Sequence, residues 1–274
     1  LGSFAADWSP TWGSSFYSSW SEPLYVAFII GLTCVGGGIT YWIMESYADK
    51  KYELGSASET DKFAFADLFK FDKSFWYIVI LCVTFYSAVF PFRTFAIKFY
   101  MEAHNATREF AGQLNSALIF ASMIATPLFG LLADKIGKRA TMMMIGSILI
   151  LPVYLMLVYL DLSLYIPITM MGIAFSLIPA IMWPSVAYLV KQNHLGTAYS
   201  IMTLIQQLGV FAFNYLLGWS NDISGASAQN PMGYAMGMWI LSILGIIGLV
   251  VAYLLRREEL GPRGHGLEKA TGNA

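Results

Sequence analysis

Two charged residues, Arg93 and Lys98, stand inside an apolar run of the sequence. A charged group at the centre of such a run costs at least about 2.5 kcal/mol to insert into a membrane, so it usually has a function. The Arg93 guanidinium could bind a carboxylate through paired hydrogen bonds, or it could reach the outer headgroups. Lys98 lies near the end of its run, and we expect its ammonium to extend to the interface. Arg93 is therefore a candidate ligand-binding residue.

The apolar runs lack the residues that catalysis in a membrane would need. No Asp, Glu or His lies deep in any run, and no paired catalytic set or metal-binding cluster occurs there. The sequence therefore predicts no enzyme, no metal and no other cofactor, and these runs offer no carboxylate for a proton relay. The net charge of -1 also leaves no basic stripe that could bind nucleic acid. A small molecule is the expected ligand.

Aromatic residues precede proline at two places in the apolar runs. Phe90 is followed by Pro91 and Trp183 by Pro184, while Pro179 is a second proline in the later run. A proline lacks an N–H and is expected to interrupt a helix, which frees carbonyls that lipid does not satisfy but a water-filled cavity does. We predict helix breaks at all three prolines, and a cavity between the two runs.

The side chains around these prolines could form a substrate site. Phe90 and Trp183 offer aromatic faces to an apolar or cationic group, and Tyr86 precedes Phe90 by one helical turn. With Arg93 as the partner of a carboxylate, these groups would match a zwitterionic peptide. Neutral polar side chains elsewhere in the runs either bind substrate or join helices to one another. They are Asn115, Gln206 and Gln207.

The elements that would position these residues are seven apolar runs. The chain is 57% hydrophobic and 12% charged with a mean hydropathy of +0.59, whereas soluble domains are about 25% charged. Each run reaches or approaches the roughly 20 residues that cross a membrane. The runs cover residues 24–44, 75–100, 113–133, 141–160, 164–190, 197–218 and 234–255. The sequence predicts an all-α membrane protein with seven transmembrane helices.

The basic residues predict the orientation of these helices. Nearly all of the 16 Lys and Arg residues follow the first, third, fifth or seventh run, whereas Arg108 is the only one in the opposite loops. Because cytoplasmic loops carry the excess of positive charge, residues 45–74 and the tail 256–274 are predicted to be cytoplasmic. Residues 1–23 are then a non-cytoplasmic loop.

A short pattern suggests an internal repeat. Residues 130–137 and residues 218–225 both carry Gly, Asp and Gly at the same offsets, and each set ends an apolar run. The two sets fall on opposite faces of the membrane, as an inverted repeat requires. Repeats of this kind are typical of transporters.

The stretch Gly-Leu-Leu-Ala-Asp-Lys-Ile-Gly-Lys-Arg at residues 130–139 resembles the signature of the major facilitator superfamily. The matching positions are Gly130, Asp134, Lys135, Gly137, Lys138 and Arg139. Gly130 would allow close approach of a helix, and Asp134 would lie against the positive N-terminus of a neighbouring helix and so act in gating. The alternative is a tight basic turn that only connects two helices.

The resemblance implies how the runs map onto a family of two six-helix halves. Residues 24–44 would correspond to helix six, residues 45–74 to the connection between the halves, and residues 75–255 to the C-terminal six-helix bundle. Helices one to five are then expected to lie outside this sequence, in an N-terminal half that is a partner of this one. In the family, the aspartate of this signature faces helix five.

Short motifs resemble more closely a branch of the superfamily that moves dipeptides across the lysosomal membrane. They are residues 90–92, 115–116, 127–132, 183–184, 195–199 and 205–206. Arg93 departs from that branch, in which an apolar residue is typical. The resemblance implies a uniporter that works by alternating access, in a bacterial inner membrane or a lysosome. A transporter of another small organic solute and a seven-helix receptor are the alternatives.

Overall fold

The computed structural model describes residues 22–52, 71–262 and 264–269. Within these ranges the regular elements are helices, and the described chain has no strand beyond one bridge between Ser227 and Asn230. Seven helical segments are long and apolar enough to cross a membrane. The predicted all-α membrane fold is confirmed. Most of the predicted loop 1–23 and the middle of the predicted connection 45–74 lie outside the described residues.

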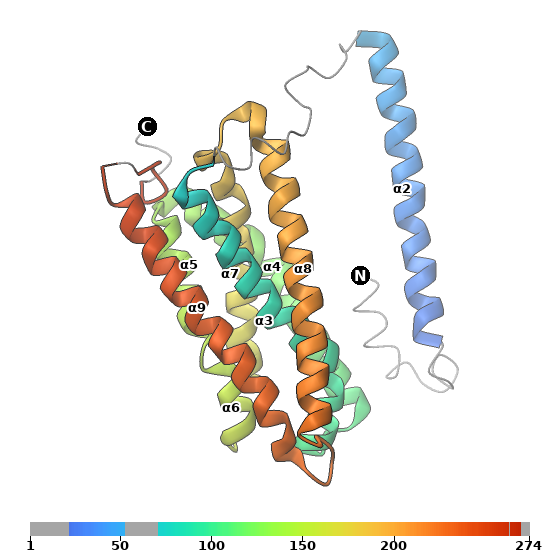
Figure 1. Cartoon of the computed structure of the whole chain (residues 1–274). Helices are drawn as coiled ribbons and strands as arrows, with labels where there is room; N and C mark the ends of the chain where they lie inside the picture. Colours follow the sequence, from blue (N-terminus) through green and yellow to red (C-terminus); the bar gives the residue numbers. More distant parts are fainter. Residues whose placement is uncertain (1–21, 53–70, 263, 270–274) are drawn as a thin grey trace.

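Helices α3 to α9 pack into one bundle, and α2 stands apart from it (Figure 1). The α-helices are α2 (Glu22–Tyr52), α3 (Lys73–His104), α4 (Arg108–Ile136), α5 (Arg139–Ile150), α6 (Val153–Tyr159), α7 (Tyr165–Leu189), α8 (Leu195–Ile223) and α9 (Ala235–Glu259). Two short 3₁₀ helices, η4 (Gln192–His194) and η5 (Pro231–Tyr234), precede α8 and α9. The assignment of α2 as helix six of a preceding half stays a prediction.

The repeat seen in the sequence has a counterpart in the helices. Helices α4 and α8 are each 29 residues long. Each is followed by a glycine with positive φ, Gly137 at 69° and Gly225 at 60°. Only glycine adopts this backbone region without strain. The helix ends differ in detail, because Gly137 is the C-cap of α4, whereas Gly225 follows Ser224, the C-cap of α8.

The predicted helix breaks are wrong, because α3 runs through Pro91, and α7 runs through Pro179 and Pro184. A proline removes only one backbone hydrogen bond. The N–H and C=O groups on either side of it find no water in the membrane, so they keep their hydrogen bonds within the helix. The fourth run is the one that divides, into α5 and α6, around Leu151 and Pro152.

Helix α2 also extends further than the run 24–44 and ends at Tyr52. Residues 45–52, which we placed in the cytoplasmic connection, are helical. Hydropathy marks where a chain leaves the hydrocarbon region, but charged residues such as Glu45 and Lys50 favour helix, so the helix continues beyond that point.

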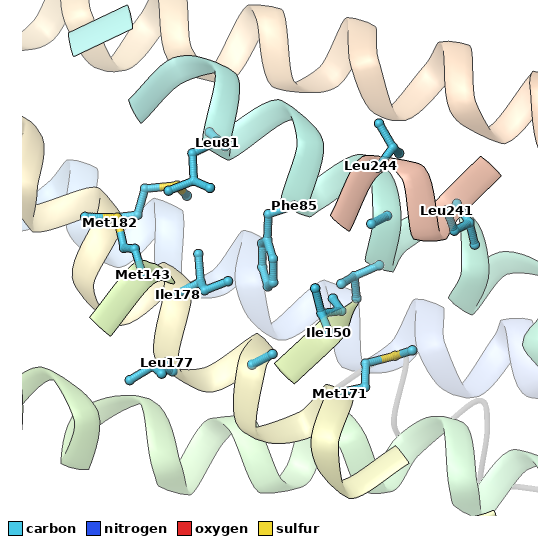
Figure 2. Packing of buried hydrophobic residues seen from close by; sticks show 14 of the residues in the cluster. Leu81, Phe85, Met143, Ile150, Met171, Leu177, Ile178, Met182, Leu241 and Leu244 are labelled. Atoms are coloured by element: carbon cyan, nitrogen blue, oxygen red, sulfur yellow. The ribbon is translucent and has the colours of Figure 1, made fainter. Parts of the chain in front are cut away.

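The core lies between α3, α5, α7 and α9. Figure 2 shows Leu81 and Phe85 of α3 facing Met143 of α5 and Ile178 of α7, and all four side chains are buried. The membrane span of α3 is 67% buried, but that of α4 is 17% and that of α8 is 22%. Within the described part of the chain, α4 and α8 therefore present broad apolar faces that no other helix covers.

Candidate functional site

An aromatic cluster joins α3, α7 and α8. The indole Nε1 of Trp183 donates a hydrogen bond to the Tyr86 hydroxyl at 3.0 Å, and the Trp183 ring stacks on Tyr199 with centroids 6.0 Å apart. The Tyr199 hydroxyl donates to the Trp183 carbonyl at 3.2 Å. Tyr86 in turn stacks on Phe90 at 5.5 Å. Three of the predicted site residues, Tyr86, Phe90 and Trp183, are thus brought together.

The cluster continues towards the middle of α7. The Phe90 ring meets Phe175 edge-on at 6.0 Å, and Phe175 stacks on the buried Phe85 at 6.2 Å. Tyr86, Phe90 and Trp183 are half-buried, so each keeps part of its surface open to the side of the bundle. The polar edges of Tyr86 and Trp183 are bonded to each other, which leaves aromatic faces as the groups that a ligand would contact.

Two residues of this cluster, Tyr199 and Phe175, were not predicted as site residues. Phe175 lies two turns before Trp183 in the same helix, so helical spacing places it near the same face. Tyr199 lies 16 residues after Trp183 and on another helix. No local pattern relates those two positions, since the pairing depends on how α8 packs beside α7.

Arg93 follows Tyr86 by seven residues and Phe90 by three, so the three side chains lie on one side of α3. Arg93 is half-buried, whereas its neighbours Pro91 and Phe92 are buried. With a rise of 1.5 Å per residue, Arg93 lies about 10 Å along the helix from Tyr86, towards the loop between α3 and α4. That separation is similar to the length of a short peptide.

The neutral polar residues divide into two groups. Gln206 of α8 is buried, and its Oε1 accepts a hydrogen bond from Cys82 Sγ of α3 at 3.4 Å, so it joins two helices. Asn115 of α4 is also buried. Gln207 is exposed on the next position of α8 and remains open to a ligand or to another part of the protein.

The signature residues form a charged turn at the basic end of the bundle. Arg139, which is 3% exposed, forms an ion pair with Asp134, whose side chain is 60% exposed. The Arg139 guanidinium also lies over the Tyr188 ring of α7, 4.9 Å from its centroid, and donates to the Tyr188 hydroxyl at 3.3 Å. This pair connects α4, α5 and α7.

The turn itself depends on its backbone. Gly137 and Lys138 both have positive φ, which reverses the chain between α4 and α5 within two residues. Lys135 and Lys138 are exposed. The predicted role of Gly130 finds no support here, because a side chain at that position would have no described atom within 4 Å. The pairing of Asp134 with Arg139 of the same chain was not predicted.

The family model described as the Major Facilitator Superfamily matches the chain over residues 8–209 and again over residues 92–272. The lysosomal dipeptide transporter MFSD1 of Gallus gallus is 32% identical over 206 residues, which are 72% of this chain and 47% of that protein. The same transporter of Danio rerio is 34% identical over 63% of this chain and 37% of its own length. That of Homo sapiens is 30% identical over 85% of this chain and 51% of its own length.

The chain thus spans about half the length of the curated relatives that it matches. The two family matches together cover most of the sequence, and they fit the seven membrane-spanning helices and the charged turn at residues 130–139. This chain belongs to the major facilitator superfamily.

Proposed function

We propose that the chain is the C-terminal part of a transporter that moves a small solute, with dipeptides as the substrate class, by alternating access. The observation that carries this proposal is the aromatic cluster of Tyr86, Phe90 and Trp183, which is half-buried on the side of the bundle where α3, α7 and α8 meet. The names of the relatives, all lysosomal dipeptide transporters, support the substrate class.

The chemistry of a dipeptide fits what this side of α3 offers. The ammonium group of a peptide would lie over the faces of Phe90 and Trp183, and its carboxylate would pair with Arg93. Along α3, Arg93 lies about 4.5 Å from Phe90 and about 10 Å from Tyr86, and the roughly 7 Å span of two extended residues falls between these distances. The cluster consists of aromatic side chains, and the described ranges hold no group of residues that could bind a metal ion. We propose transport and not an enzymatic reaction.

In this proposal, α2 is helix six, α3 to α9 form the C-terminal bundle, and helices one to five belong to the same protein. The apolar faces of α4 and α8 that no described helix covers support such a partner half, because they offer it a surface to pack against. We propose a uniporter, as the resemblance to the dipeptide-transporting branch implies. The described spans carry no carboxylate deep in the membrane, so a proton relay would have to use the other half.

Orientation belongs to the same proposal. The turn between α4 and α5, the connection between α7 and α8, and the end of α9 lie at one end of the bundle, uppermost in Figure 1. These segments carry Lys138, Lys191 and Arg256, which supports a cytoplasmic C-terminus. Single cysteines at the exposed positions Ser163 and Lys191 would test this. An impermeant thiol reagent should label Ser163→Cys from outside and Lys191→Cys only after the membrane is opened. The reverse pattern would refute the orientation.

The substrate class is tested with the full-length protein in proteoliposomes. Binding of alanylphenylalanine and of its C-terminal amide is compared in the wild type and in Arg93→Gln. We expect Arg93→Gln to weaken binding of the free dipeptide roughly tenfold and to leave binding of the amide nearly unchanged, because only the former presents a carboxylate. An equal loss for both ligands would exclude Arg93 as the carboxylate partner, and no binding of either would exclude dipeptides.

A second candidate function is the transport of another small organic solute. The exposed amide of Gln207 and the absence of an acidic partner in the aromatic cluster, within the described helices, are compatible with such a solute. A panel of amino acids and sugars in the same binding assay distinguishes the two. A seven-helix receptor would bind its ligand without net uptake into the vesicles.

A further inference from the structure

The chain after α9 folds back over the basic end of the bundle. Helix α9 ends at Glu259, and residues 264–269, which we name the tail clamp, return towards the start of α5. Leu267, in the middle of the tail clamp, is completely buried. A hydrophobic anchor of this kind holds the segment in place.

The tail clamp supplies hydrogen-bond acceptors to the first turn of α5. Leu267 accepts from the backbone N–H of Arg139 at 2.8 Å. The Glu268 carboxylate accepts from the backbone N–H and the hydroxyl of Thr141, both at 2.8 Å. The first N–H groups of a helix have no partner within it, and the residue before α5, Lys138, makes no side-chain cap. Glu268 therefore caps α5 from a distant part of the sequence.

A second anchor fixes the tail clamp to α3 and α9. The buried carboxylate of Glu259 accepts hydrogen bonds from Ser74 of α3 at 2.8 Å and from the backbone N–H of His265 at 2.8 Å. The His265 ring nitrogen Nδ1 lies 3.0 Å from the same carboxylate, and Nε2 lies 3.7 Å from Asp72. A buried carboxylate needs such partners, so the clamp and the bundle depend on each other.

The residue that begins α5 is Arg139, which also pairs with Asp134 and lies against Tyr188. The tail clamp therefore holds the backbone of Arg139 through Leu267, while the Arg139 side chain joins α4 to α7. Arg256 of α9 adds a hydrogen bond from its Nε to the Thr141 hydroxyl at 2.8 Å. Movement of α5 relative to α4 would have to break these contacts together.

We propose that the tail clamp positions Arg139 for its pair with Asp134, and that Glu268 is the residue through which the C-terminal segment sets the balance between the conformers of the transporter. This inference rests on the proposed alternating access, which it extends to a regulatory contact. A partner that binds or modifies the C-terminal segment would then change the conformer balance without touching the substrate site.

The experiment uses full-length protein without substrate, in wild type, Glu268→Ala and the control Glu258→Ala. Glu258 carries the same charge in the last turn of α9, and its side chain makes no hydrogen bond to the described residues. Hydrogen exchange of the amides at 139–141 measures the capping. We expect Glu268→Ala to raise their exchange roughly fivefold and Glu258→Ala to leave it unchanged. Glu268→Gln, which keeps an acceptor oxygen, should restore part of the protection.

The second measurement is the rate at which a thiol reagent labels Thr94→Cys on the exposed side of α3 from outside, in a background without Cys34 and Cys82. A changed conformer balance alters this rate several-fold in Glu268→Ala but not in Glu258→Ala. Unchanged exchange at 139–141 would overturn the capping role, and faster exchange with an unchanged labelling rate would overturn the coupling. Neither measurement uses a substrate, so a failure of dipeptide binding leaves the outcome intact.

Discussion

The aromatic cluster and the charged turn hold helices together by different means. Around Trp183, two neutral hydrogen bonds and several ring contacts join three helices, and the side chains stay half-buried. Around Arg139, the buried guanidinium forms an ion pair and a cation–π contact, and the backbone N–H of the same residue donates a hydrogen bond to Leu267. Ring contacts tolerate small shifts, but a network of charged hydrogen bonds is either made or broken. The first arrangement suits a site that accepts varied ligands, and the second suits a switch between two states.

This difference yields separate expectations for the two regions. Substitutions in the aromatic cluster should change substrate affinity and leave the conformer balance in the absence of substrate nearly constant. Substitutions at the charged turn should change the conformer balance and leave the substrate affinity of the competent conformer nearly constant. A variant that changes both to the same degree would show that the two regions act as one unit.

The largest effect is expected for Trp183→Ala in the aromatic cluster. This change removes the ring contact with Tyr199 and the hydrogen bond to Tyr86, so substrate binding should weaken roughly tenfold or more. Trp239→Ala is a matched control, because Trp239 Nε1 also donates to a tyrosine, Tyr159, at 2.9 Å, but on the exposed side of α9. Titration calorimetry would compare the two. Similar losses for both variants would mean that Trp183 acts only in packing.

A smaller effect is expected for Asp134→Asn in the charged turn. Losing one charge of this ion pair should change the conformer ratio several-fold, since a half-exposed contact of this kind contributes about 1 kcal/mol. Labelling of Thr94→Cys in the substrate-free protein measures the ratio, and the affinity for substrate in the competent conformer should stay the same. Lys135→Gln, at an exposed neighbouring charge, serves as the control. An unchanged ratio in Asp134→Asn would remove its gating role.

The smallest effect is expected for Tyr199→Phe. The change deletes only the hydrogen bond to the Trp183 carbonyl, and the ring contact remains, so we expect about a twofold loss of affinity. Equilibrium binding to the purified variant would measure it. A loss as large as that of Trp183→Ala would mean that the Tyr199 hydroxyl contacts the substrate directly.

The sequence was sufficient for those features of the fold that depend on local pattern. Seven apolar runs predicted the membrane helices, and the spacing of Tyr86, Phe90 and Arg93 placed them on one side of α3. The sequence did not predict the contacts of Tyr199 and Glu268, because each depends on the packing of elements that are distant in the chain.

The helix breaks show a different limit of sequence analysis. Pro91, Pro179 and Pro184 lie within continuous helices, while the chain is interrupted near Pro152. The second and fourth runs each contain one proline, Pro91 and Pro152, yet only the fourth run is interrupted. What differs is the packing around them: at the interruption α9 approaches closely, with Gly245 so near Leu151 that an added Cβ would lie 3.3 Å from its Cα. Such contacts are a property of the folded bundle.

The central claim is that the aromatic side of α3 lines the substrate path, and accessibility tests it most directly. Single cysteines replace Phe90 and, as a matched control, the buried Phe92 in full-length protein without Cys34 and Cys82. We predict that a water-soluble thiol reagent labels Phe90→Cys, that alanylphenylalanine slows this labelling, and that Phe92→Cys does not react. Absence of labelling at Phe90→Cys, or labelling that the dipeptide leaves unchanged, would contradict the claim.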